Sequence, residues 1–272
     1  GWIGNRNDLE RPWGCLQALG LRAWRFHRVI AEQTGWRPYY CALRESPTVD
    51  LTAGFDAYYA SRCGDHPRTF HDQRKRARKL ADQFGPLHLT WHDDIATQLP
   101  ALIADKRAQY QRTGVVDVLG FGWTVALLHR LAAQQSPACA GVMSVLRAGE
   151  RVVARHFGLR ASNRLHAWFP AYDADVRRWS PGLQLWIELF REATNREIVR
   201  CDLGAGGEPF KAKLANGGCW IAEGVAETSV QRAWLRREWY RGTAWLKTRL
   251  EIPSVRRLVR PLLRSWKRRA FR

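Results

Sequence analysis

The order of apolar runs in the second half of the chain restricts the fold most strongly. Between Gly141 and Asp173, three apolar runs are separated by the turn-like stretches RAGE and RASN, which predicts an antiparallel meander. The next stretch, SPGLQLWIELFREATNR, predicts a helix with Ser180 as N-cap, Pro181 at the first helical position and one apolar face (Leu183, Trp186, Ile187, Phe190). A strand at EIVRCDLG, a short helix at EPFKAKLAN and a strand at CWIAEGVAE give the order β-β-β-α-β-α-β. Such a crossover implies an α/β fold with a mixed β-sheet, splayed where parallel pairing begins and flanked by helices.

The first half of the chain gives weaker patterns. Residues 14–33 have an apolar rhythm that predicts a helix, and residues 36–51 are expected to be extended around a buried strand at YYCAL. The stretch TFHDQRKRARKLADQFG predicts a helix with a basic outer face that ends at Gly85-Pro86. LHLTWH alternates like an edge strand, and further helices are expected at 94–112 and 122–134.

The net charge of +19 is concentrated near the C-terminus. Residues 232–272 hold 14 Lys and Arg against two Glu, a net charge of +12, which implies an anionic partner. Apolar residues between Val255 and Trp266 follow helical spacing with basic residues on the other faces, and Pro261 predicts a kink. This pattern favours a helix at 251–272 that lies on an anionic inner-membrane surface; a helix docked on the body or on a sister subunit is the alternative.

The six cysteines are scattered without a CxxC pair, so no metal site is expected. Several lie in apolar runs, which suits reduced thiols and a cytoplasmic location. No run of about 18 apolar residues occurs, so no membrane-spanning helix is predicted. The chain begins at Gly1, and we expect a natural N-terminal part to precede it.

Four stretches together resemble a known family: RKRARKLADQFGPLHL (74–89), VVARHFGLRASNRLHAWFPAYD (152–173), SPGLQLW (180–186) and DLGAGGEPFKAKL (202–214). They resemble the GNAT acyltransferases and, more closely, the CelD-like acetyltransferases of cellulose and exopolysaccharide biosynthesis. The chain is more distantly similar to the Fem peptidyltransferases, which pair two GNAT-like lobes. The resemblance implies an incomplete GNAT-like lobe at 1–135, a complete C-terminal acyltransferase lobe at 136–230 and a basic helical tail at 231–272.

The resemblance also implies an acyl-CoA donor, with acetyl-CoA as the first choice, and an amine or hydroxyl acceptor. An amino sugar or saccharide intermediate of exopolysaccharide biosynthesis is expected to attack the thioester directly. The CoA pyrophosphate is expected at a helix N-terminus, whose free N–H groups and dipole attract anions; the residues concerned are Arg177, Arg178, Ser180, Gly182 and Leu183. An ordinary N-cap with solvated arginines is the alternative. The family's Q/R-x-x-G-x-G/A loop is reduced here to a single glycine.

Four residues are candidates for catalysis: His156, Tyr172, Asp202 and Lys211. His156 lies inside an apolar run, where it acts as a base or fills the core. Asp202 ends a strand and either faces a cleft or makes an Asx turn into the glycines. Lys211 either stabilises an oxyanion or pairs with Glu208 on the surface, and Tyr172 either protonates the leaving thiolate or only packs.

Candidates for binding the acceptor are Arg78, Lys106, Tyr110 and Glu208. Phe210 stands where family members usually have tyrosine, and with the reduced glycine loop it favours a non-catalytic, membrane-associated scaffold as one alternative. The other alternative is a Fem-like transferase that uses aminoacyl-tRNA, for which the basic charge would contact phosphates. Aromatic residues are not interleaved with the arginines at 74–79, so nucleic acid is not the expected partner.

Overall fold

The computed structural model describes residues 12–136, 138–206, 208–229, 231–236, 238, 239 and 242. The helices are α1 (Pro12–Ala18), α2 (Phe55–Asp65), α3 (Pro67–Phe84), α4 (Ile95–Thr113), α5 (Gly122–Ala133), α6 (Pro181–Asn195) and α7 (Pro209–Leu214), with 3-10 turns η2 (Thr34–Tyr39), η3 (Val118–Gly120) and η4 (Ala174–Trp179). The strands are β1 (Ala23–Ile30), β2 (Tyr40–Asp50), β3 (Leu87–Thr90), β4 (Ala140–Ala148), β5 (Arg151–Ala161), β6 (Arg164–Tyr172), β7 (Arg200–Asp202) and β8 (Gly217–Glu227).

The strands form a mixed sheet in the order β1-β8-β2-β7-β6-β5-β4-β3. Strands β4, β5 and β6 pair antiparallel, as the RAGE and RASN turns predicted, and β3 lies at the edge. Helix α6 then leads to β7, which pairs parallel with β6. The predicted α/β fold with a mixed sheet and flanking helices is therefore confirmed.

Two compact units make up the chain, and they do not follow the lobes expected at 1–135 and 136–230, which stay predictions. The larger unit comprises Pro47–Gly217. The smaller unit combines residues 12–46 with the described part of 218–242. Every candidate site residue named above belongs to the larger unit.

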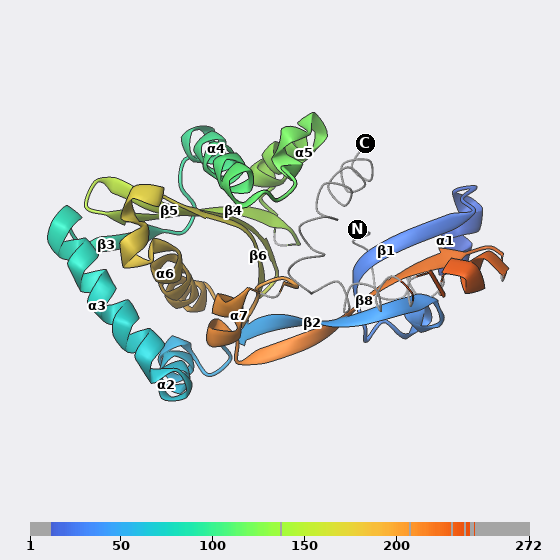
Figure 1. Ribbon diagram of the computed structural model, residues 1–272, viewed down its shortest axis with the longest axis horizontal. Helices are drawn as coiled ribbons and strands as arrows, with labels where there is room; N and C mark the ends of the chain where they lie inside the picture. The colour runs from blue at the N-terminus through green and yellow to red at the C-terminus, as the bar shows by residue number, and fades with distance from the viewer. Residues whose placement is uncertain are drawn as a thin grey trace. The chain divides into compact units, whose positions relative to one another are not determined.

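In the larger unit, helices cover both faces of the meander (Figure 1). Helices α4 and α5 bury Leu99, Leu102 and Leu128 against Met143 and Phe157 on one face. Helices α3 and α6 cover the other face, where Leu80 and Leu185 pack on Leu146 and Val153. Both sets of side chains are excluded from water, which is the main force that holds helices on a sheet.

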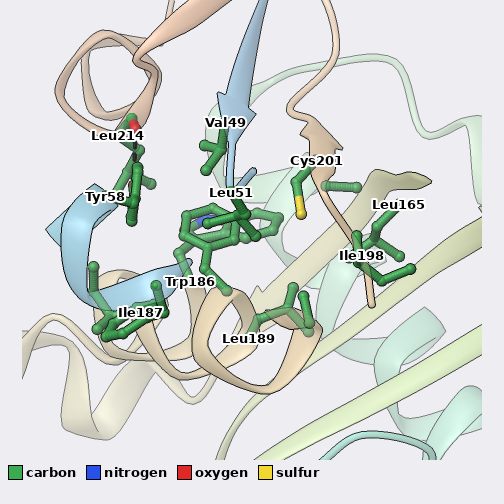
Figure 2. Close-up of a cluster of buried hydrophobic side chains, with 14 of the residues drawn as sticks. Val49, Leu51, Tyr58, Leu165, Trp186, Ile187, Leu189, Ile198, Cys201 and Leu214 are labelled. Carbon is green, nitrogen blue, oxygen red and sulfur yellow. Dashed lines mark hydrogen bonds between the residues drawn. The ribbon is translucent and has the colours of Figure 1, made fainter. Parts of the chain in front are cut away.

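The apolar face predicted for α6 is buried in a cluster shared with α2, β2 and β7 (Figure 2). Trp186, Ile187 and Phe190 contact this cluster, and Leu183 packs at its margin. The hydroxyl of Tyr58 on α2 donates to the carbonyl of Leu214 at 2.8 Å, which fastens the end of α7 to the same core. The short helix after the glycine loop is therefore anchored rather than free at the surface.

The helix expected at 14–33 is wrong. Helix α1 ends at Ala18, and β1 follows and pairs antiparallel with β8. Trp24 and Phe26 alternate with charged residues at a period of two, and aromatic side chains favour strands. The ring of Phe26 packs edge-on against Trp36 at 4.8 Å, so tertiary packing of aromatic residues stabilises the strand.

Among the helices of the described residues, none has the length and hydropathy needed to cross a lipid bilayer. The predicted membrane-surface helix at 251–272 lies outside the described residues.

Candidate active site

Strands β6 and β7 separate soon after their pairing begins. Their parallel register covers only Arg164–His166 against Arg200–Asp202, after which β6 continues to Tyr172 while β7 ends. On its other side, β6 has a bulge, because Phe157 pairs with Phe169 whereas Gly158 pairs with Ala167. A bulge interrupts the ladder of backbone hydrogen bonds and is common beside active sites. The sheet is therefore open at the C-terminal ends of β6 and β7.

A pocket of about 500 Å³ lies at the N-terminus of α6. Four of the five expected cofactor residues line it, namely Arg177, Ser180, Gly182 and Leu183, together with Tyr172 at the end of β6. Arg76 of α3 and Lys213 of α7 also line it and were not predicted. The pocket thus combines three cationic side chains and the carboxylate of Asp72 with the first turn of α6. Leu183 and Gln184 donate to the Ser180 carbonyl and Pro181 has no N–H, which leaves the N–H of Gly182 as the backbone donor for a ligand.

The helix start beside this pocket has an unusual cap. Ser180 adopts a left-handed conformation, with φ at 54°, and its side chain makes no capping hydrogen bond. Its hydroxyl instead accepts a hydrogen bond from the guanidinium of Arg76. A Cβ added at Gly182 would meet the ring of Tyr172 at 3.5 Å, an ordinary contact. The Ser180 side chain therefore leaves the N–H of Gly182 uncapped and available to an anion.

Two buried glutamines fix α3 against α6 below the pocket. Gln73 Nε2 donates to Gln184 Oε1 at 2.6 Å, and Gln184 Nε2 donates to the Gln73 carbonyl at 3.0 Å. Tyr59 donates to Gln73 Oε1 at 2.9 Å. Because buried polar groups stay in place only when paired, this network fixes the position of Arg76 relative to Ser180.

These residues fit the diphosphate and pantetheine arm of acyl-CoA. Arg76, Arg177 and Lys213 outweigh the single carboxylate of Asp72 and match a doubly charged diphosphate, and the α6 N-terminus adds the N–H of Gly182. Leu183 and Phe210 line the same pocket and suit an apolar arm. Among the described residues, no three His, Cys, Asp or Glu side chains gather as a metal site would require.

Arg178 lies away from this pocket, unlike the other expected cofactor residues. Its guanidinium stacks 3.8 Å from the centre of the Trp179 ring and donates to Gln83 Oε1 at 3.2 Å. It lines an adjoining hollow of about 340 Å³ with Asp72, Lys75, Arg76 and Lys79, and this hollow shares Asp72 and Arg76 with the first pocket. Arg78, expected to bind the acceptor, is exposed on α3.

The loop after β7 brings Asp202 and Lys211 close together. Asp202 Oδ1 accepts from the N–H of Gly204 at 2.8 Å, which is the Asx turn considered as the alternative to a catalytic role, and Gly204 has φ at 73° as glycine permits. Lys211 Nζ donates to the Gly204 carbonyl at 3.1 Å and lies 3.0 Å from Glu208 Oε2. The Lys211 side chain is only 12% exposed whereas that of Glu208 is 55% exposed, so the pair joins a buried cation to a surface carboxylate.

The sequence reasoning missed His166. Its Nδ1 lies 3.1 Å from Asp202 Oδ2, across the parallel pairing of β6 and β7. The sequence offered one signal for this residue, a histidine within the apolar run that forms β6. The bulge at Trp168, two residues later, is visible only in the structure. The structure makes it the partner of the predicted Asp202.

Lys106 and Tyr110 reach the same region from α4. Lys106 Nζ donates to the Pro170 carbonyl at 2.8 Å and to Gln109 Oε1 at 3.1 Å, and it lies 5.5 Å from the centre of the Tyr110 ring. Burial lowers the pKa of Lys106 to about 8, Glu208 opposes this shift and Lys211 adds to it. The charges of Glu208 and Lys211, at the start of α7, therefore both influence the pKa of Lys106.

His156 lies inside the core. It is fully buried, its ring packs 5.3 Å from Trp186, and neither ring nitrogen has a hydrogen-bond partner among the described residues. Burial lowers its pKa to about 3, with the charge of His166 adding to the shift. This placement favours a core role, and its catalytic role stays a prediction.

Cys201 points into the apolar cluster (Figure 2). Burial raises the pKa of its thiol, which makes it inert as a nucleophile.

A mixed sheet that splays beside a basic pocket at a helix N-terminus defines a GNAT-type acyltransferase. The profile of the family described as "Acetyltransferase (GNAT) domain" matches residues 68–212, more than half of the chain, and the chain belongs to this family. No curated protein matches its sequence.

Two solved structures are similar in fold. One is the C-terminal domain of a putative lysylphosphatidylglycerol synthetase from Agrobacterium fabrum, with a TM-score of 0.50 and 15% identity, covering 82% of this chain and 73% of that one. The other is FemX, with a TM-score of 0.51 and 9% identity, covering 83% and 78% respectively. At these identities the likeness shows the fold alone.

Proposed function

We propose that the protein transfers an acyl group, with acetyl as the first choice, from acyl-CoA to an amine or hydroxyl of a saccharide acceptor. The observation that carries this proposal is the basic pocket at the N-terminus of α6, beside the opening between β6 and β7. Membership of the GNAT family supports the acyl transfer itself.

Each part of the site has a chemical role in this proposal. Acyl-CoA supplies a thioester whose carbonyl is open to attack. Arg76, Arg177 and Lys213 neutralise the diphosphate at the first turn of α6. Lys211 has three N–H groups, of which Gly204 and Glu208 take two, so a third is available for the negative charge that develops on the carbonyl oxygen. Phe210 has no hydroxyl, so Tyr172 or water protonates the leaving thiolate.

An amino sugar of exopolysaccharide biosynthesis is the acceptor we propose. The resemblance of residues 74–89 and 202–214 to CelD-like acetyltransferases supports it. Glu208 and Asp202 would attract the ammonium group of such a sugar, with Tyr110 as an aromatic neighbour. A cytoplasmic location with contact to the inner membrane belongs to the same proposal, supported by the charge of +12 in residues 232–272.

Calorimetry with acetyl-CoA tests the donor site. Gly182→Asp would place a carboxylate beside the diphosphate, and we expect at least a tenfold loss of affinity. Gly182→Ala is the matched control, because its Cβ makes only an ordinary contact with Tyr172 and should bind nearly as the wild type does. Unchanged affinity in a folded Gly182→Asp protein would show that the phosphates bind elsewhere.

A second candidate is a transferase that uses aminoacyl-tRNA. The hollow lined by Lys75, Arg76, Lys79 and Arg178 beside Trp179 favours it, because clustered cations next to an aromatic ring suit a nucleic-acid backbone. Fluorescence anisotropy with labelled tRNA at 50 and 200 mM salt separates the candidates. A protein that binds tRNA but not acetyl-CoA would belong to the second class, and one that binds neither would be a scaffold.

A further inference from the structure

Lys106 has a hydrogen-bonding environment that fits a neutral amine. The residue is 8% exposed and lies on α4, with Nζ donating to two neutral oxygens, those of Pro170 and Gln109. A neutral amine has two N–H groups and one lone pair, whereas an ammonium has three N–H groups. Two acceptors therefore satisfy the neutral form and leave its lone pair available.

The charged groups around Lys106 come from α7, and its aromatic neighbour comes from α4. Glu208 and Lys211 act on it with opposite signs, and the ring of Tyr110 lies beside it. Burial dominates, and it lowers the pKa of Lys106 to about 8. A lysine with this pKa is half deprotonated at about pH 8 and keeps a neutral fraction of about a tenth at pH 7, which suits proton transfer.

The carboxylates at the opening are engaged, and His156 is buried. Asp202 accepts from Gly204 and contacts His166, and Glu208 contacts Lys211. His156 is enclosed by the core. His166 keeps Nε2 as a second proton-accepting atom, and Lys106 is the buried amine whose two described acceptors are neutral.

We propose that Lys106 is the general base that removes a proton from the acceptor's ammonium group, an inference that rests on the acyl transfer proposed above. The lone pair on Nζ takes one of the three ammonium protons, and Lys106 becomes an ammonium stabilised by Glu208. The freed amine forms the C–N bond as the C–S bond breaks. Its second proton goes to the departing thiolate, its third remains on the amide, and Lys106 returns its proton to water.

The first test needs no substrate. The chain has seven lysines, so the side-chain ¹⁵Nζ and ¹³Cε signals can be followed individually against pH by NMR. We expect one signal to titrate near pH 8 and to be missing from Lys106→Met. A Lys106 signal that titrates above pH 10 would overturn the proposal, because the residue would then be a fixed cation.

The second test compares two variants of Lys106, one that keeps its positive charge and one that removes it. Lys106→Arg keeps a cation but cannot lose its proton at neutral pH, and Lys106→Met keeps the length without a base. With acetyl-CoA and glucosamine, thiol release by both variants should fall about 100-fold or more, while calorimetric affinity for acetyl-CoA stays unchanged. Wild-type turnover by Lys106→Arg would make Lys106 an anchor instead.

The donor experiment separates the two proposals. Absence of acetyl-CoA binding by the wild type would remove the proposed function. A Lys106 signal titrating near pH 8 would still support a neutral amine at this position. If the wild type binds acetyl-CoA normally but Lys106 titrates above pH 10, the role of Lys106 as general base is wrong and the proposed acyl transfer is unaffected.

Discussion

At the scale of single residues, Lys211 is the clearest candidate for stabilising the developing oxyanion. We expect Lys211→Met to lower the single-turnover rate about 100-fold, since one preorganised donor typically contributes about 3 kcal/mol. Acetyl-CoA affinity should stay near normal, because the residue is not among those lining the donor pocket. Glu208→Gln is the comparison, and its effect should be much smaller. Equal rates for wild type and Lys211→Met would reduce this loop to a tight turn.

Lys106 also predicts how stability depends on pH. Its folded pKa of about 8 lies below the value of 10.5 in an unfolded chain, so the unfolded state binds more protons between these values. The free energy of unfolding of the wild type, relative to Lys106→Met, should therefore rise between pH 8 and pH 10.5, by an amount on the order of 2 kcal/mol. Urea unfolding of both proteins at pH 7 and pH 10 measures this. A constant difference would contradict a neutral buried amine.

Single residues were predictable from sequence where their chemistry is local. The Asx turn at Asp202 needs only the glycine two positions later, and the motif itself indicated it. His166 and Lys106 depend on partners that are 36 and 64 residues away in the chain, namely Asp202 and Pro170. Without the register of β6 against β7 and the docking of α4, nothing in a single sequence links these residues.

At the scale of secondary-structure elements, α2 determines where α7 ends. Tyr58 donates to the Leu214 carbonyl, and Arg62 Nη1 donates to the Ala215 carbonyl at 2.8 Å. Tyr58→Phe would leave a buried carbonyl without its donor, which typically costs about 1–3 kcal/mol. Urea unfolding should show this loss, and acyl transfer should slow because α7 carries Lys211. Thr113→Val, at an exposed helix end, should change stability by less than about 0.5 kcal/mol. Equal stability of Tyr58→Phe and wild type would mean that the core alone fixes α7.

The elements that the sequence predicted well have strong local signals. Helix α6 has a proline at its first position and an apolar face, and the meander has two recognisable turns. The stretch at 14–33 has neither, and its strand β1 depends on pairing with β8 about 200 residues later. A short apolar stretch whose strand partner is distant cannot be assigned from periodicity alone.

At the scale of the whole molecule, the family fold places the reaction where the two faces of the sheet meet. The donor pocket is formed by α3, η4, α6 and α7, while Lys106 reaches Pro170 of β6 from α4 on the opposite face. The opening between β6 and β7 lets groups from both faces approach one centre.

The charge distribution of the whole chain leads to the last prediction. The catalytic site that we propose lies within Pro47–Gly217, whereas +12 of the net charge lies in residues 232–272. Each basic residue near an anionic surface contributes about 1 kcal/mol, so binding should be strong at low salt and fall steeply as salt screens the charges. We expect the full chain to sediment with phosphatidylglycerol vesicles at 50 mM salt, and much less at 300 mM.

Deletion of residues 251–272 is the matched test of this prediction. It removes the apolar spacing from Val255 to Trp266 together with eight of the basic residues. The shortened chain should stay in the supernatant with phosphatidylglycerol vesicles at 50 mM salt. Neither form should sediment with phosphatidylcholine vesicles, which carry no net charge. Acetyl-CoA affinity should be the same in both, since the donor pocket lies within Pro47–Gly217. Equal sedimentation of the two forms with phosphatidylglycerol would show that the basic segment contacts something other than a membrane.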